Sequence, residues 1–530
     1  MRRRGLGWKS ARIVLVCFLV AGTLVGCASN NLANDTKVLR VIHSDDPTTL
    51  DPATNYDYSS TVLMTAYESL ITLKQGTTEL SPCLATSWEP SADGLKWTFH
   101  LRDGVKFSDG TVMDAAAVKF SYDRMLKINQ GAAWMFSAVK DIAAPDPKTV
   151  VFTLKYPYTP FLASIAQPCA TGIVSPTAVK AHEENGDMAQ KWLQDHTAGT
   201  GPYVVNGWTP GQQVVATRNK YYWRGWSGNH FERIIFLTVK EASTQNMMIE
   251  KGQADINPVV ADLTNIKDLA NKPGVKIEVN PTLVMHYITL NTTRKPLDNV
   301  KVRQALAHAV DYNRILSEFY NGYGEIAQGP VPKGLWGHDD SLPLYDFDLA
   351  KSKELLKEAG YPNGGFKLRL VYESGNDTMS RIAQSLQANL KELGIDLQIE
   401  ALTMPTIMDQ FKSPETAPDL RIDHWTVDYA DPDDYLTAIF TTGAFSPNGG
   451  NRSFYSNKTI DDLAARAQTI SDQTQREAIY KQMQQIIVAD SPVIWLVQPK
   501  AVIVMRDNLR NYQYFPNIWE YWYDYYKEKT

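Results

Sequence analysis

The sequence has little cysteine, no long apolar run and no excess of positive charge. Four cysteines among 530 residues are too few for a disulfide-dense scaffold. No apolar run reaches the roughly 18 residues of a membrane-spanning helix, which excludes a polytopic membrane protein. A net charge of −5 and a pI near 6.0 argue against a nucleic-acid partner, because nucleic-acid binders normally carry a basic face. What remains is a large, mildly acidic globular protein of three or four domains, or of two large lobes.

Motifs of the common enzyme classes are absent as well. The chain has no phosphate-binding loop, no His-Glu-x-x-His, no Gly-x-Ser-x-Gly and no Cys-x-x-Cys. Gly199-Thr200-Gly201-Pro202 begins like a dinucleotide fingerprint but lacks the third glycine, so we interpret it as a turn. The nine histidines are scattered, without the spacing of a metal cage. We therefore expect no enzymatic activity, no catalytic residue, no metal and no cofactor.

The N-terminus is typical of an exported protein. Five basic residues between Arg2 and Arg12 precede an apolar stretch from Ile13 to Gly26, which suits the hydrophobic region of a signal peptide. The stretch ends in Leu24-Val25-Gly26-Cys27, which resembles the lipobox of bacterial lipoproteins. An ordinary signal peptide with a nearby cysteine is the alternative. The prediction is a signal peptide over 1–26, a lipid on Cys27 and a polar tether over 27–37.

Cleavage and lipidation leave two cysteines, Cys83 and Cys169. Exported proteins meet an oxidising environment, so this pair could form a disulfide. Two unrelated buried thiols are an equally good interpretation, because sequence does not reveal proximity.

Strand signals dominate the first half of the chain and helical periodicity the second. The alternating run Trp97–Leu101 lies between Asp93-Gly94 and Asp103-Gly104, a strong hairpin signal. Helices are expected after Asp298, over 348–359, over 379–393, and once or twice over 460–488. Strands over 366–372 and 395–402 flank the 379–393 helix, and further strands are expected over 493–497 and 501–504. This alternation predicts an α/β lobe beside a strand-rich one.

Several long motifs occur in a recognisable order over nearly all of the chain after Val38. The motifs are Asp46-Pro47-Thr48-Thr49-Leu50-Asp51-Pro52, Leu80–Glu89, Trp97–Gly110, Gly199–Tyr203, Asn291-Thr292-Thr293 and Val302–Leu306. Together they resemble the family 5 extracellular solute-binding proteins, the peptide- and nickel-type receptors of ABC importers.

The resemblance implies an α/β, periplasmic-binding-protein-like clamp of type II (cluster C), in which two lobes joined by a hinge close on a ligand. Lobe I would be discontinuous, built from 38–70, 175–271 and 491–530. A strand-rich extra subdomain would span 71–174, and lobe III would span 272–490. The aromatic residues between Tyr512 and Tyr526 fit a core or hinge better than a sugar-stacking surface.

The resemblance also implies a ligand site. In the peptide receptors, a Trp followed three residues later by an Asp lies at the cleft, and the Asp pairs with the ligand's α-ammonium group. Trp425 and Asp428 stand at these positions, although Asp428 could instead cap a turn. Weaker matches are the loop Tyr56-Asp57-Tyr58 and Trp134, for which a buried core position is the alternative. His424 departs from the peptide-receptor pattern and is a further candidate.

The expected cargo is a short peptide captured in the cleft between the lobes. A nickel chelate, an oligosaccharide, an opine or another cationic metabolite are the alternatives. The expected partners are the permease and ATPase subunits of an ABC importer and, through the lipid, a membrane. The receptor itself is expected to be a monomer without nucleic acid, in the periplasmic space or at the cell surface.

Overall fold

We analysed a computed structural model, which describes residues 35–55, 60–167, 172–258, 260, 263, 266–517 and 520–529. The predicted signal peptide, Cys27, the loop Tyr56-Asp57-Tyr58 and Cys169 lie outside these residues. Within them, no helix combines the length and apolar character needed to cross a membrane.

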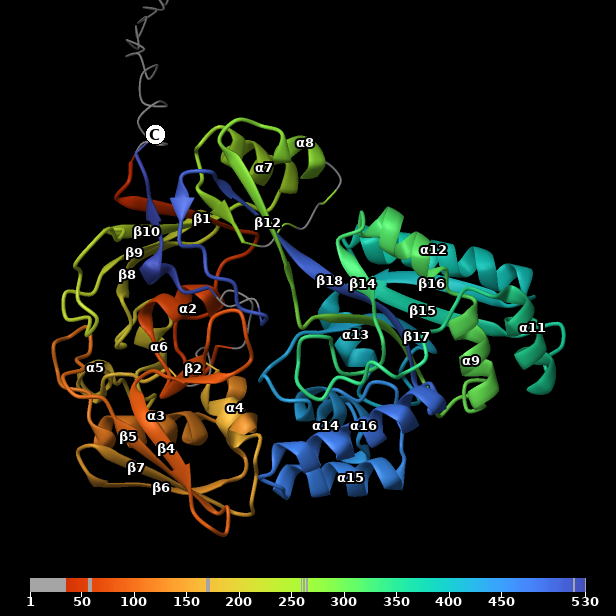
Figure 1. The fold of residues 1–530 in the computed structure, drawn as a ribbon, viewed down its shortest axis with the longest axis horizontal. Helices are drawn as coiled ribbons and strands as arrows, with labels where there is room; N and C mark the ends of the chain where they lie inside the picture. The colour runs from red at the N-terminus through yellow and green to blue at the C-terminus, as the bar shows by residue number, and fades with distance from the viewer. Residues whose placement is uncertain are drawn as a thin grey trace, which may run out of the picture.

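Two lobes and a subdomain share the chain, and the largest sheet runs through both lobes (Figure 1). Its strand order is β16-β15-β17-β13-β18-β11-β1-β10-β9-β8, and β12 and β14 also pair with β18. The long strand β18 (Val493–Arg506) joins the two lobes, because its first part pairs with β13 and its last part with β12 and β11. The two strands expected over 493–497 and 501–504 are therefore one continuous strand.

Lobe I is built around the β11-β1-β10-β9-β8 part of the sheet. Its core contains Leu39, Val41, Ile234 and Phe236, and the C-terminal Trp522 and Tyr525 pack into the same cluster, which confirms the core interpretation of the aromatic C-terminus. Its strands are β1 (Val38–His43), β8 (Tyr203–Thr209), β9 (Gln213–Arg218), β10 (Arg233–Thr238), β11 (Ile256–Asn257) and β12 (Val275–Pro281). The predicted start of lobe III at residue 272 places β12 in lobe III, but β12 pairs with the part of β18 that belongs to lobe I. Its helices are α2 (Ser60–Ala66), α5 (Pro176–His182), α6 (Gln190–Leu193), α7 (Ala242–Glu250) and α8 (Ile266–Ala270).

The termini of the described chain meet in lobe I. The Lys527 Nζ donates to the carbonyl oxygen of Val38 at 2.7 Å and forms an ion pair of 2.8 Å with the buried Asp255. The turn at Gly199–Pro202 packs against α2, and a Cβ on Gly201 would lie 2.6 Å from the backbone of Ala66, so only glycine fits there. The short pair β19 (Leu509–Arg510) with β20 (Tyr526–Lys527) completes this lobe. A second short pair, β2 (Ile71–Leu73) with β3 (Leu80–Pro82), packs Ile71 and Leu73 into the same core cluster as the extra subdomain.

The extra subdomain is an antiparallel sheet of order β4-β5-β7-β6 covered by α3. Gly94 has φ +67°, as the turn between β4 and β5 requires, so the hairpin predicted at Asp93-Gly94 is confirmed. The strands are β4 (Ala85–Pro90), β5 (Lys96–Leu101), β6 (Val139–Asp146) and β7 (Thr149–Leu154). The helices are α3 (Ala115–Ile128), the 3₁₀ helix η1 (Gly131–Phe136) and α4 (Phe161–Ile165).

Lobe III is the predicted α/β lobe. Strands β15 and β16 are parallel neighbours connected by α12, which confirms the βαβ unit. Asp348 caps α11, and Gly360 and Gly394 adopt positive φ just after α11 and α12, as expected of helix ends. The strands are β13 (Met285–Leu290), β14 (Gly324–Ile326), β15 (Lys367–Glu373), β16 (Asp396–Leu402) and β17 (Leu420–Trp425).

One helix start differs from expectation. The side chain of Asn299, not that of Asp298, accepts the N–H of Lys301, so α9 begins one residue later than predicted. The 460–488 region forms two helices. The helices of lobe III are α9 (Val300–His308), α10 (Tyr312–Arg314), the π-helix η2 (Ile315–Phe319), α11 (Leu349–Glu358), α12 (Asp377–Glu392), α13 (Met404–Gln410), α14 (Asp433–Phe440), α15 (Lys458–Thr469) and α16 (Gln473–Asp490). Two short 3₁₀ turns, η3 (Thr442–Ala444) and η4 (Trp522–Asp524), complete the chain.

Candidate functional site

The loop between β17 and α14 holds Trp425 and Asp428 in a defined arrangement. Asp434, in the first turn of α14, accepts hydrogen bonds at its Oδ2 from the indole Nε1 of Trp425 and from the backbone N–H of Asp428, each at 3.0 Å. Both Trp425 and Asp428 are half-buried, whereas Asp434 is fully buried. Asp434 therefore fixes the indole and the loop relative to each other, a role that the sequence did not reveal.

This loop is electrostatically negative. Burial raises the pKa of Asp434 well above its ordinary value, and the charge of Asp428 raises it further. Two carboxyl groups so close together in a water-poor place favour a cation between them or a proton on one of them. The arrangement therefore suits recognition of a positively charged group.

The extra subdomain reaches across to the same loop. The side chain of Gln167 donates from Nε2 to the carbonyl oxygen of Asp428 at 2.8 Å, although the two residues are 261 positions apart. The Trp134 ring lies 6.3 Å from the ring of Tyr429, and Trp134 is 43% exposed, so it is not a core tryptophan. The structure thus brings Trp134 to Tyr429, the residue after Asp428, and adds Gln167, which the sequence analysis did not name.

A second set of contacts joins the extra subdomain to lobe III near the α14 and α15 helices. Thr159 donates to the backbone oxygens of Gln468 and Ile470, and the hydroxyl of Tyr158 lies 3.4 Å from Asp433. Trp134 and the loop that holds Asp428 therefore belong to two parts of the molecule that are bonded to each other.

The side chain of His424 does not lie on the same face of β17 as that of Trp425. Side chains alternate along a strand, so Leu420, Ile422 and His424 point to one face of β17, and Trp425 to the other. His424 lies opposite His286 of β13, with 5.7 Å between the ring centroids, and burial lowers the pKa of both imidazoles. The described residues gather no group of three or more His, Cys, Asp or Glu side chains that could hold a metal ion.

A charged cluster lies on the same face of β17 as Trp425. Asp423 is buried and forms ion pairs with Arg421 at 2.9 Å and with Arg452 at 3.2 Å. Burial alone would raise the pKa of Asp423, but the two guanidinium groups hold it below its ordinary value. Apolar and charged residues alternate in Leu420-Arg421-Ile422-Asp423, and from this alternation the proximity of Arg421 and Asp423 could have been predicted.

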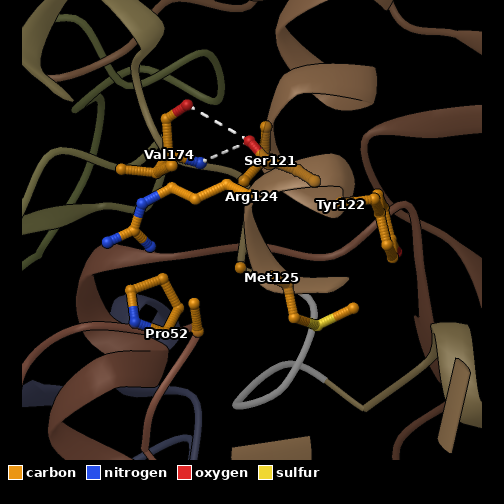
Figure 2. A pocket seen from close by; sticks show the side chains of 9 residues that line it. Pro52, Ser121, Tyr122, Arg124, Met125 and Val174 are labelled. Carbon is orange, nitrogen blue, oxygen red and sulfur yellow. Dashed lines mark hydrogen bonds between the residues drawn. The ribbon is translucent and has the colours of Figure 1, made fainter. Parts of the chain in front are cut away.

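The segment before the Tyr56-Asp57-Tyr58 loop is anchored by a buried ion pair. Asp51 accepts two hydrogen bonds from Arg124 of α3, at 2.7 and 2.6 Å. A cavity of about 10 Å³ lies beside Arg124, lined also by Pro52, Ser121 and Val174 (Figure 2). It has room for at most about one water molecule, so it is no cargo site.

Cys83 is a free thiol in the structure, and burial raises its pKa well above the ordinary value. Since Cys169 lies outside the described residues, the disulfide between them stays a prediction.

The sequence matches known proteins over most of its length. The family described as bacterial extracellular solute-binding proteins, family 5, matches residues 79–447. A probable D,D-dipeptide-binding periplasmic protein, DdpA of Escherichia coli (strain K12), is 34% identical over 482 residues, which are 89% of this chain and 90% of that protein. The glutathione-binding protein GsiB of Shigella dysenteriae is 31% identical, over 96% of this chain and 98% of its own.

Solved structures share the fold. The ABC transporter-associated periplasmic binding protein DppA from Helicobacter pylori, in complex with the peptide STSA, superposes with a TM-score of 0.81 at 29% identity, covering 94% of this chain and all of that one. HbpA2 from Haemophilus parasuis gives a TM-score of 0.80 at 28% identity, over 93% and 100%.

The chain belongs to the family 5 extracellular solute-binding proteins. The predicted family and the two-lobed α/β clamp are confirmed. Proteins of this family are exported solute receptors of transport systems rather than enzymes, and this chain is one of them, as the sequence predicted.

Proposed function

We propose that this protein is the lipid-anchored receptor of an ABC importer and that it captures short peptides through their N-terminal ammonium group. The observation that carries the proposal is the Trp425–Asp428 loop, which the buried Asp434 holds in place and which Gln167 and Trp134 of the extra subdomain contact at Asp428 and Tyr429. The peptide bound to the Helicobacter pylori protein and the dipeptide named for the Escherichia coli relative support a peptide cargo.

The chemistry follows from charge and burial. A carboxylate in a cleft that closes around its ligand forms a strong, charge-assisted hydrogen bond with an ammonium group, since little water competes for either partner. Trp425 and Trp134 provide aromatic walls for the peptide. In the proposal Tyr56, Asp57 and Tyr58 border the ligand from lobe I, and His424 stays outside the cleft.

Asp428→Asn tests the ammonium contact. The amide keeps the size and the turn geometry of the side chain but removes its charge, so peptide affinity should fall roughly 30-fold or more, as truncating a buried charge pair commonly costs about 2–5 kcal/mol. Calorimetry with dialanine and N-acetyl-dialanine, each against wild type and variant, measures the coupling. Acetylation should weaken binding to the wild type strongly and to the variant much less.

Asp462→Asn is the matched control, because Asp462 is an exposed carboxylate on α15 paired with Lys458. It should bind both peptides like the wild type. If the losses of affinity caused by Asp428→Asn and by N-acetylation simply add, Asp428 does not contact the amine.

The anchor and the delivery step belong to the same proposal. The basic start followed by Leu24-Val25-Gly26-Cys27 supports a lipid on Cys27, and a receptor held at the membrane meets its permease and ATPase partners there. Cys27→Ala should leave the protein unprocessed or release it from membranes. Fractionation of a normally processed Cys27→Ala protein with the membranes would refute the lipoprotein assignment.

A further inference from the structure

Asp434 is a fully buried carboxyl group that uses only one of its two oxygens. Its Oδ2 accepts the hydrogen bonds of Trp425 and Asp428, at 3.0 Å each, but its Oδ1 meets no donor within the described part of the chain. The residue is 0% exposed and forms no ion pair with any other described residue. An ionised carboxyl group has about four acceptor sites, so a negative charge on Asp434 would be poorly supported here.

The charged groups nearest to Asp434 also oppose its ionisation. Burial raises its pKa well above the ordinary value, and the carboxyl groups of Asp428 and Asp433 raise it further. The arginines of the neighbouring segments form their ion pairs with other carboxylates, namely Arg452 with Asp423 and Arg476 of α16 with Asp431. Among the described residues, Asp434 therefore has acidic neighbours and no paired cation.

The other titratable groups packed around α14 do not compensate for this. Buried tyrosines surround the loop and the helix, and burial raises the pKa of each, so they stay neutral: they are Tyr158, Tyr287, Tyr429, Tyr435 and Tyr480. From α15, Asp461 accepts the N–H of Thr442 beyond the end of α14, and the uncharged Gln468 bonds Asp433. A neutral Asp434 is the favoured form as long as no cation is bound nearby.

We infer that Asp434 holds a proton on Oδ1 in the ligand-free protein and releases it to the solvent when an ammonium group binds at Asp428. The O–H bond breaks, its electron pair stays on Oδ1, and the positive charge of the cargo replaces that of the proton. The inference rests on the proposed function, because it assigns the ammonium group of the cargo to Asp428. An opposite charge within about 4–6 Å commonly lowers the pKa of a carboxyl group by about 1–3.

Two consequences follow for the cargo. The loop takes up a cation without a change in its net charge, because one positive charge leaves as another arrives. Since binding releases a proton, the affinity rises with pH, by up to about tenfold per pH unit where the release is complete. Asp434 thus acts as a positioning residue that holds Trp425 and the loop in both states, and as the group that exchanges its proton for the cargo.

Calorimetry in two buffers of different ionisation enthalpy counts the released protons. Dialanine, in its L and D forms, is titrated into the purified protein in phosphate and in HEPES between pH 6.5 and pH 8. We expect the wild type to release up to one proton per bound peptide, in addition to the titration of the peptide itself. Binding of dialanine to the wild type without this release would overturn the inference.

Asp434→Asn is the decisive variant, because its amide oxygen can accept the same two hydrogen bonds and the side chain mimics the neutral carboxyl group. It should bind dialanine and release no proton beyond the titration of the peptide. Asp462→Asn, the exposed control, should release as many protons as the wild type. If the release persists in Asp434→Asn and is lost in Asp433→Asn, the proton belongs to Asp433 and the inference is wrong.

A measurement on the ligand-free protein separates this inference from the proposed function. Protonated carboxyl groups absorb in the infrared at a higher frequency than carboxylates, so the spectrum of the wild type minus that of Asp434→Asn should contain a carboxylic-acid band. If no dialanine binds, the proposed function fails, and the presence of this band would still support Asp434 as the group that holds the proton. Its absence would overturn the inference whether or not peptides bind.

Discussion

Two buried arginines, Arg124 of the extra subdomain and Arg421 of lobe III, differ in how many of their donor groups are hydrogen-bonded. Arg124, in α3, donates from Nη1 and Nη2 to Asp51 and from Nε to the carbonyl oxygen of Met188 at 2.9 Å. Arg421, in β17, directs Nη2 at Asp423 and leaves Nε and Nη1 without an acceptor in the described part of the chain. Both residues are 3% exposed. Equal burial with unequal pairing separates an arginine whose donors are all used to hold the fold together from one whose donors are only partly used by the described residues.

The largest effect is expected at Arg124. Arg124→Met leaves the carboxylate of Asp51 buried and uncompensated, so the free energy of unfolding should fall by about 3–5 kcal/mol. Urea unfolding measures this change. Lys37→Met is the control, because Lys37 and Glu232 form an exposed ion pair, more than half open to solvent on each side, which should contribute little. A loss below about 1 kcal/mol at Arg124 would contradict the comparison.

Glu68, a buried carboxylate that forms an ion pair with no cation among the described residues, gives a second test in the same half of the molecule. Glu68 accepts hydrogen bonds from Thr200, Tyr222 and Trp223, and burial raises its pKa to about 7. The folded protein keeps this proton where the unfolded chain has lost it. The stabilisation is therefore complete below about pH 4.5 and disappears as the pH rises through 7.

Glu68→Gln should remove this contribution, which is on the order of 1–3 kcal/mol between pH 5 and pH 8. The measurement is the difference in unfolding free energy between the two pH values, in the wild type and in the variant. An unchanged difference would mean that Glu68 is ionised in the folded protein.

The smallest effect on stability is expected at Arg421. Arg421→Met removes the unpaired donors and leaves Asp423 paired with Arg452, so the unfolding free energy should change by no more than about 1 kcal/mol. Urea unfolding of this variant beside Arg124→Met makes the comparison direct. A loss as large as that of Arg124→Met would make Arg421 a structural arginine.

Much of the fold could be predicted from local sequence. The βαβ unit of lobe III, the Asp348 cap and the hairpin at Asp93-Gly94 depend on periodicity and on residues a few positions apart. Such signals fail by one residue where two capping side chains compete, as Asp298 and Asn299 do before α9.

The candidate site was less predictable, because its parts come from distant segments. Trp425 and Asp428 could be found from one motif, but the contact from Gln167 depends on how the extra subdomain meets lobe III. The pairing of Arg452 with Asp423 spans 29 residues and carries no periodic signal. Neighbours in the sequence can also be separated in space: His424 directly precedes Trp425 but faces the other side of β17.

The shared strand β18 also affects how the molecule can be assembled. The sheet of lobe III is incomplete until residue 499 has been synthesised, and that of lobe I until residue 506, because successive parts of β18 serve the two lobes. Between these two parts, the side chain of Gln498 bonds the backbone of Thr282 and of Lys333, which ties the crossing point to lobe III. No single cut through the chain therefore yields two fragments that each contain the complete sheet of one lobe. A nascent chain of this design stays unfinished, and so open to threading through an export channel, until nearly all of it exists.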